Sequence, residues 1–157
     1  MSHATAAGEA HTTSCNDARI HTFGVLLEAM AHLNRTFDRS LQTRIGINQS
    51  LFEGLLRLER SGGELSMGAL ADQIALTSGG VTRMVARLVE AGYAERRSCE
   101  ADRRVQYVAI TDSGRDVLSR ALAVHLEDLE EHFTGKLSPD ERRTIVDVME
   151  RIRPHHS

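Results

Sequence analysis

The sequence predicts a mainly α-helical fold with one small β-hairpin, in which long helices at both ends of the chain flank a group of short elements. Two observations carry this prediction. Apolar residues recur every three or four positions near both ends of the 157-residue chain, and the middle holds short, well-punctuated segments followed by two strand-like runs. A chain of this length supports one ordinary domain with a proper core.

The first long helix is predicted from a stripe of apolar or packable residues at alternating steps of three and four. Its members are Ile20, Phe23, Leu27, Met30, Asn34, Phe37 and Leu41. This spacing is a heptad pattern, in which a polar residue such as Asn34 commonly fixes the register of paired helices. A packing stripe inside one domain has the same periodicity, so the pattern alone leaves both interpretations open.

Short elements follow, each with a start or stop signal. Gly46-Ile47-Asn48 opens a helix that Ser61-Gly62-Gly63 closes. Ser66 is placed to cap a short helix, and Thr77 to cap the next one, which ends at Gly92.

Two strand-like runs come next, at 93–98 and 105–110, and the polar tip 99–104 joins them. A second long helix begins after the capping residue Thr111 and extends to Phe133. The last helix follows Ser138-Pro139-Asp140-Glu141, a capping-box pattern with proline at the first helical position.

Two short helices joined by a tight turn and followed by a hairpin are typical of a winged helix-turn-helix. The second helix would lie in the major groove of DNA, with the hairpin beside it as the wing. Because Val81, Met84, Val85 and Leu88 must face the core, Ser78, Gly79, Thr82, Arg83 and Arg87 are expected to face outward.

Gly79 and Gly80 lie in the first turn of this helix, where glycine lowers helix stability. The absence of side chains there would let the helix N-terminus approach a phosphate or a base edge closely. Tight packing of Gly80 on a neighbouring helix is the alternative. At the wing tip, Asp102 is placed to hold Arg104 in a fixed pose for a narrow minor groove, although a charged tip is often simply solvated.

Charge is unevenly distributed along the chain. The net charge is −3, yet residues 77–107 carry six arginines against four acids. A locally basic segment attracts phosphates even in an acidic chain, because counterion release depends on the face presented.

Four stretches resemble the signature of the MarR family of transcriptional regulators. They are Leu76 to Arg83, Leu88 to Arg96, Asp102-Arg103-Arg104 and Ile110-Thr111-Asp112-Ser113-Gly114. The order of long helix, winged helix-turn-helix and two further helices also matches over nearly the whole chain. Gly79 and Gly80 depart from the family pattern, where proline, serine or threonine is frequent, which puts side-chain readout there in doubt.

The resemblance implies a homodimeric regulator, expected to be a repressor, that binds a pseudo-palindromic double-stranded DNA operator and is released by a small, often aromatic acid. The expected divisions are a disordered tail (1–18), an N-terminal dimerisation helix (19–45), the DNA-binding domain (46–110) and C-terminal dimerisation helices (111–153). The expected DNA-binding residues are Ser66, Thr77, Ser78, Gly79, Thr82, Arg83, Arg87, Asp102, Arg103 and Arg104. Arg19 and His21 are the cationic candidates for an acidic effector, with a solvated helix start as the alternative.

Other kinds of sensing stay open. Cys99 has arginines nearby that would favour a thiolate, so a redox-responsive regulator of the same fold is one alternative, whereas Cys15 lies in the tail. His125, Asp128 and His132 share a helix face, as do Glu28 and His32, so a metal-responsive regulator of the same fold is an alternative, although no metal site is assigned. A winged-helix protein-interaction module without a DNA role is the alternative from another class.

Several classes are not expected. No Ser/His/Asp, Cys/His or phosphate-loop pattern appears at useful spacing, so we expect neither an enzyme nor a cofactor. The apolar runs are too short to span a membrane, and the first 18 residues lack the features of a secretory signal, which favours a cytoplasmic protein.

Overall fold

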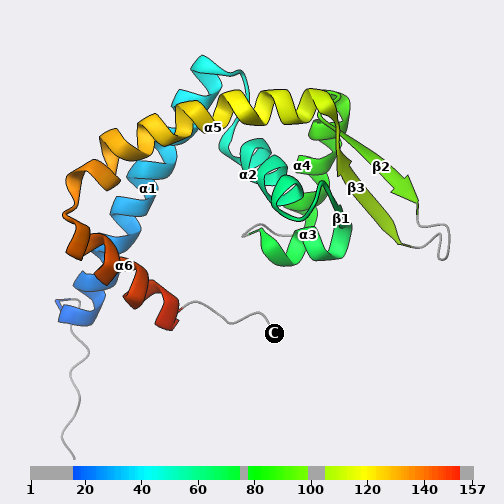
Figure 1. The fold of residues 1–157 in the computed structure, drawn as a ribbon. Coiled ribbons are helices and arrows are strands. Elements are labelled where there is room, and N and C mark those ends of the chain that lie inside the picture. The colour runs from blue at the N-terminus through cyan, green and yellow to red at the C-terminus, as the bar shows by residue number, and fades with distance from the viewer. Residues whose placement is uncertain (1–15, 75–77, 99–104, 153–157) are drawn as a thin grey trace, which may run out of the picture. The chain divides into compact units, whose positions relative to one another are not determined.

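The computed structural model describes residues 16–74, 78–98 and 105–152. The chain forms two units that divide between His32 and Leu33. Figure 1 shows the elements in chain order. The helix α1 (Ala18–Arg44) contributes to both units, and every other element lies in the second.

The two halves of α1 differ in burial. In the first unit, Ile20, Phe23, Leu27 and Met30 are all exposed. In the second unit, the heptad stripe ends in the core of the chain itself, because Phe37 and Leu41 are buried. The predicted stripe therefore serves as intradomain packing at its C-terminal end only.

The helix α2 (Gln49–Arg60) begins as predicted from the sequence. The side chain of Asn48 accepts a hydrogen bond from the backbone N–H of Leu51 at 3.0 Å and so caps the helix. Its apolar face, which includes Phe52, Leu55 and Leu58, is fully buried. This helix forms the centre of the second unit.

Two shorter helices follow. The helix α3 (Met67–Gln73) is capped by Ser66, whose Oγ accepts from the N–H of Ala69 at 3.2 Å, as predicted. The helix α4 (Ser78–Glu90) is followed by Gly92, whose φ of 74° is in the left-handed region that glycine adopts without strain. This residue turns the chain into the sheet.

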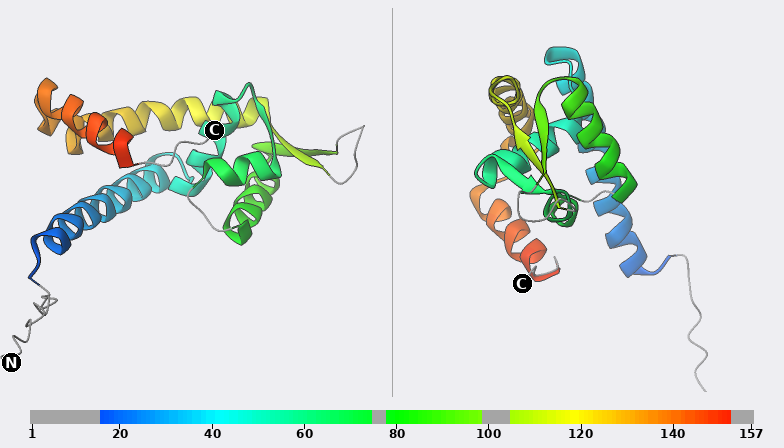
Figure 2. Two further views of the ribbon diagram at one scale, coloured as in Figure 1. Left: turned by 90° about the horizontal axis from the view of Figure 1, so that it is seen from below. Right: turned by 90° about the vertical axis from the view of Figure 1, so that its right-hand side faces the viewer.

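The sheet has three strands where the sequence predicts two. The strands are β1 (Glu64–Ser66), β2 (Ala94–Ser98) and β3 (Gln106–Ile110), in the antiparallel order β1-β3-β2. Ser66 lies opposite Tyr107, and Ala94 lies opposite Ile110. Figure 2 shows β2 and β3 extending beyond the neighbouring helices, as expected of a wing.

The helix α5 (Asp112–His132) starts against the base of the sheet. Thr111 caps it by accepting from the N–H of Gly114 at 3.1 Å, and donates its hydroxyl proton to the carbonyl of Gly92 at 2.7 Å. A Cβ on Gly114 would lie 2.1 Å from the backbone oxygen of Tyr93, so only glycine permits this contact. The first turn of α5 is thereby joined directly to the wing.

The chain ends with a short 3₁₀ turn, η1 (Thr134–Lys136), and the helix α6 (Pro139–Ile152). The predicted capping box is present, because Glu141 accepts from the N–H and the hydroxyl of Ser138 at 2.8 Å. No residue of α6 is buried. Within the described ranges, no helix is long and apolar enough to cross a membrane.

Candidate DNA interface and ligand pocket

The helix α4 presents two opposite faces. The residues predicted to face the core, Val81, Met84, Val85 and Leu88, are buried. Gly79, Thr82, Arg83 and Arg87 are exposed, as predicted. The same buried face that anchors the helix therefore fixes which side chains point to solvent.

Arginines near this face differ in their partners. Arg83, Arg87 and Arg96 form no ion pair with any residue that the structure describes, and all three are exposed. Such guanidinium groups keep their hydrogen-bond donors available for phosphate or base edges.

Arg97, on β2, is bound by two carboxylates. Its guanidinium pairs with Glu95 on the same strand and with Glu64 on β1, the latter at 3.3 Å. The hydrogen bond to Glu95 raises the pKa of Arg97, which stays charged. Because the ion pairs reach across β3, Arg97 ties the outer strands of the sheet together. The charge count over residues 77–107 includes Arg97 among the cations that could bind phosphate. Its partner Glu64 lies 33 positions earlier, outside that segment.

Open space surrounds Gly79. A Cβ built there would meet only Nη1 of Arg83, at 4.0 Å, so packing among the described residues does not require glycine. The position is exposed in the first turn of α4.

The side chain of Ser66 caps α3, because its Oγ accepts a hydrogen bond from the backbone N–H of Ala69. The hydroxyl proton of Ser66 is not used in this bond. Thr77, Asp102, Arg103 and Arg104, together with Cys15 and Cys99, lie outside the described residues, as does the side chain of Ser78. The proposed roles of these residues stay predictions.

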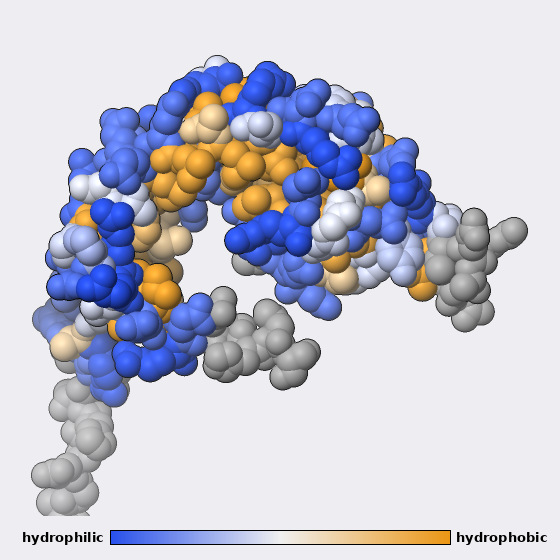
Figure 3. All heavy atoms as spheres, in the orientation of Figure 1, coloured by the Kyte–Doolittle hydropathy of each residue, from blue (hydrophilic) through white to orange (hydrophobic). Residues whose placement is uncertain are grey.

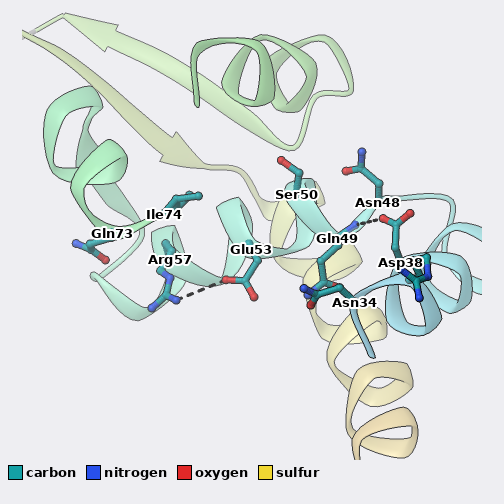
Figure 4. A pocket seen from close by; sticks show the side chains of 10 residues that line it. Asn34, Asp38, Asn48, Gln49, Ser50, Glu53, Arg57, Gln73 and Ile74 are labelled. Atoms are coloured by element: carbon teal, nitrogen blue, oxygen red, sulfur yellow. Dashed lines mark hydrogen bonds and ion pairs between the residues drawn. The ribbon is translucent and has the colours of Figure 1, made fainter. Parts of the chain in front are cut away.

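A pocket of about 640 Å³ opens between α1, α2 and the end of α3 (Figure 4). Its volume falls in the range of small-molecule sites. The lining side chains are mostly polar: Asn34, Arg35, Asp38, Asn48, Gln49, Ser50, Glu53, Arg57, Gln73 and Ile74. No motif in the sequence predicts this pocket; the one local signal is the polar spacing of Gln49, Glu53 and Arg57 along one face of α2.

Several interactions organise the pocket wall. Asp38 accepts a hydrogen bond from the backbone N–H of Gln49 at 2.8 Å, and Arg57 pairs with Glu53 at 3.6 Å. Figure 4 shows Gln49 and Asn34 near Asp38, while Glu53 and Arg57 lie closer to the α3 end, where Gln73 and Ile74 belong. The pocket thus borders the C-terminal end of α3.

The predicted effector residues Arg19 and His21 lie in the first unit and do not line this pocket. The side chain of Arg19 is 91% exposed and binds the carboxylate of Asp17 through two hydrogen bonds of 2.9 and 2.7 Å. Its guanidinium is therefore already engaged within the chain.

A second polar cluster lies where α5 meets α1 and α2. The imidazole of His125 packs between Phe37 and Phe52, with ring centroids 5.0 and 4.8 Å away. Burial lowers the pKa of His125, against the opposing charges of Glu53 and Asp128. Asp128 is only 6% exposed and lies 3.8 Å from Arg44. In the part of the chain that the structure describes, no three potential metal ligands gather, and this includes the predicted set of His125, Asp128 and His132.

The buried helix-turn-helix core, the protruding strands and the exposed face of α4 define a winged helix-turn-helix protein. Comparison with known proteins shows which regulators the chain resembles. Residues 55–105 match the MarR family model. The HTH-type transcriptional regulator YdgJ of Bacillus subtilis strain 168 is 29% identical over 128 residues, which cover 82% of this chain and 77% of YdgJ.

Solved structures agree. Sco3205, a MarR family transcriptional regulator from Streptomyces coelicolor solved in complex with DNA, has 27% identity and a TM-score of 0.80, over 87% of this chain and 93% of Sco3205. Bordetella bronchiseptica BpsR shares the fold, with 22% identity and a TM-score of 0.74 over 84% of this chain and 98% of BpsR. The chain therefore shares the fold of MarR family transcriptional regulators, and its residues 55–105 match the model of that family.

Proposed function

We propose that the chain acts as a homodimeric repressor that binds a pseudo-palindromic operator in double-stranded DNA and is released by a small molecule. The observation that carries this proposal is the exposed face of α4, where Arg83 and Arg87 are held outward by a fully packed core. Such a regulator would act in the cytoplasm, where its DNA lies.

DNA contact is assigned to residues 46–110. In this proposal α4 enters the major groove, with Gly79, Thr82 and Arg83 near base edges and Arg87 near phosphate. Ser66, Thr77 and Ser78 would bind the backbone at the helix starts. Arg104, steadied by Asp102 and flanked by Arg103, would reach the minor groove from the wing tip. Sco3205 was solved in complex with DNA, which supports DNA binding by a protein of this fold.

Dimerisation is assigned to residues 19–45 and 111–153. Several apolar side chains of these helices are left uncovered in the single chain, as at Phe23 (60% exposed), Leu126 (63%) and Ile152 (67%). Figure 3 shows hydrophobic side chains at the surface along α5 and α6. Large apolar surfaces of this kind are typical of protein interfaces.

Release by a ligand is assigned to the pocket between α1, α2 and α3. The pocket borders the end of α3, so a ligand there would contact the helix-turn-helix itself. The DNA binding of Bordetella bronchiseptica BpsR is regulated by 6-hydroxynicotinic acid, which supports ligand control in a protein of this fold.

The test compares three arginine variants in operator binding at several salt concentrations. Arg83→Ala should weaken binding by about 1 to 3 kcal/mol and relax specificity at one base pair. Arg87→Ala should lower the slope of log affinity against log salt by about 0.9, the value for one phosphate contact.

Arg97→Ala is the matched control, because its guanidinium is bound by Glu95 and Glu64. It should leave the salt slope unchanged. A salt response that is flat for the unmodified protein would exclude the DNA role and favour a protein-interaction module instead.

Two further measurements address the wing and the dimer. Arg104→Ala should weaken operator binding by about 1 to 3 kcal/mol without dissociating the dimer. Footprinting should show two half-sites about 10 base pairs apart, and a single unpaired half-site would contradict the dimer.

A further inference from the structure

Two neighbouring arginines of β2 lie on opposite faces of the sheet. Side chains alternate between the faces along a strand, and residues paired across antiparallel strands share a face. Arg96 is paired with Val108, which is completely buried, so Arg96 belongs to the face that packs against the helices. Arg97 is paired with Tyr107 and belongs to the other face, where two carboxylates bind it. The two arginines therefore have different surroundings.

The face that carries Arg96 continues from the core into the wing. Ala94, at the start of β2, is buried in the same core as Met84 and Leu88 of α4. Farther along the strand, Arg96 and Ser98 are exposed. The strands here extend beyond the neighbouring helices (Figure 2). This face of the wing thus begins beside α4 and is then open to solvent.

The polar groups on this face are hydrogen-bond donors with unused capacity. Arg96 forms no ion pair with any residue that the structure describes. Gln106 lies opposite Ser98 and donates a hydrogen bond from its Nε2 to the Oγ of Ser98 at 3.1 Å. This bond holds the hydroxyl in place but does not use its proton, which Ser98 can donate to an oxygen of another molecule.

The arrangement suits a phosphate group. Arg96 and Ser98 are two positions apart on one strand, about 7 Å, a separation that the long side chain of arginine spans. Guanidinium and hydroxyl groups are among the usual donors to phosphate oxygens in protein–DNA complexes. The residues of β2 and β3 on this face include no acid: Ala94, Arg96, Ser98, Gln106, Val108 and Ile110. An anion would therefore meet no carboxylate of these strands on this face.

We propose that Arg96 and Ser98 bind one phosphate of the DNA backbone, and that Gln106 positions the Ser98 hydroxyl for this contact. The proposal rests on the proposed function, since α4 in the major groove would bring the backbone beside the wing. A phosphate contact carries no sequence information. It would fix the position of the wing beside α4 on DNA of any sequence.

The main experiment measures DNA affinity by fluorescence anisotropy over a series of salt concentrations. One probe is an operator duplex that the unmodified protein selects from a random-sequence library, and the other is a scrambled duplex of the same length. Arg96→Ala should lower the slope of log affinity against log salt by about 0.9 on both duplexes, because one phosphate contact is lost. Arg96→Lys keeps the charge and should restore the slope.

Arg97→Ala is the matched control, because it removes the neighbouring guanidinium from the other face of the sheet. It should leave both slopes unchanged. Equal slopes for Arg96→Ala and Arg97→Ala would overturn the proposal, as would a slope that Arg96→Lys fails to restore. Thermal unfolding verifies that each variant is folded.

The ratio of the two affinities separates a phosphate contact from a base contact. Arg96→Ala should weaken binding to the operator and to the scrambled duplex by the same factor, about tenfold, so that their ratio is unchanged. A loss confined to the operator would place Arg96 at a base edge and contradict the proposal.

Two further variants test the hydroxyl. Ser98→Ala should weaken binding to both duplexes by about twofold to tenfold without changing the salt slope, because it removes a hydrogen bond and no charge. Gln106→Met should cause a smaller loss in the unmodified background and none when combined with Ser98→Ala. A loss from Gln106→Met that persists in the double variant would exclude the positioning role of Gln106.

Failure of this inference differs from failure of the proposed function. If Arg83→Ala weakens operator binding and Arg96→Ala changes neither slope, α4 binds DNA and the phosphate site on the wing is wrong. If the unmodified protein binds neither duplex, the proposed function itself is wrong, and the phosphate contact with it.

Discussion

The helix-turn-helix region and the terminal helices differ in how far their apolar side chains are buried within the single chain. In the helix-turn-helix region, Leu58, Leu70, Val85 and Val108 are completely buried within the single chain. In the terminal helices, residues such as Phe23 and Ile152 are more exposed than buried. The first region encodes its own core, and the second leaves apolar side chains exposed in the single chain, as the proposed dimerisation requires.

The junction of the two regions is well packed. Phe37 and Leu41 of α1 are buried, and Gly114 of α5 contacts the backbone of Tyr93. Changes at this junction should therefore affect the whole second unit, while changes farther out should affect only association or only DNA binding. The predictions below test that separation, in order of decreasing effect.

Gly114→Ala should have the largest effect on stability. The added Cβ would meet Tyr93 O at 2.1 Å and Ile110 Cγ1 at 2.8 Å, so the start of α5 must move away from the sheet. We expect a loss of about 3 kcal/mol or more in the free energy of unfolding, measured in urea. Gly68→Ala is the control, because a Cβ there meets nothing within 4 Å; equal losses in the two variants would refute the close-packed junction.

Phe23→Ala should weaken the dimer by about 2 to 3 kcal/mol for each phenylalanine buried at the interface. Its side chain is 60% exposed in the single chain and makes no contribution to the core of the helix-turn-helix region. Sedimentation equilibrium measures the dissociation constant. Val89→Ala removes an exposed apolar side chain from α4 instead and should leave it unchanged, and the same constant for both variants would place the interface elsewhere.

Gly79→Ala should change stability and DNA affinity in opposite directions. Alanine favours helix over glycine by up to about 1 kcal/mol, and nothing among the described residues obstructs the methyl group. Operator affinity should fall if the glycine serves a close approach to DNA. An affinity that rises together with stability would mean that this turn of α4 lies away from the DNA.

The pH dependence of stability should show the smallest effect. Burial lowers the pKa of His125, so the folded chain binds this proton less readily than the unfolded chain, whose histidine has a pKa of about 6.5. The stabilising contribution is full above that value and declines as the pH falls below it. Between pH 7 and 5 the unmodified protein should lose more stability than His125→Gln, as measured by urea titration; identical slopes would rule out this role for His125.

Local signals in the sequence were sufficient for most of the fold. The caps at Asn48, Ser66 and Thr111, and the capping box at Ser138, each depend on residues within three positions of one another, and all four are present. The inward residues of α4 followed from helical periodicity alone.

Features that depend on distant residues were missed. Strand β1 has three residues and no alternating pattern, and it exists because it pairs with β3, more than 40 positions away. The ion pair of Arg97 with Glu64 and the pocket beside α2 arise in the same way, from segments that only the fold brings together. The wing tip and Thr77 lie outside the described residues, so their DNA-binding roles stay predictions.

The contact between Gly114 and Tyr93 also couples the position of α5 to that of the wing. The helix has 21 residues, which correspond to roughly 30 Å of length. Because its first turn is packed on the base of the wing, a tilt of the helix would carry the base of the wing with it. A tilt of about 5° about the far end of a helix this long would displace its first turn by about 3 Å, close to the 3.4 Å step between base pairs.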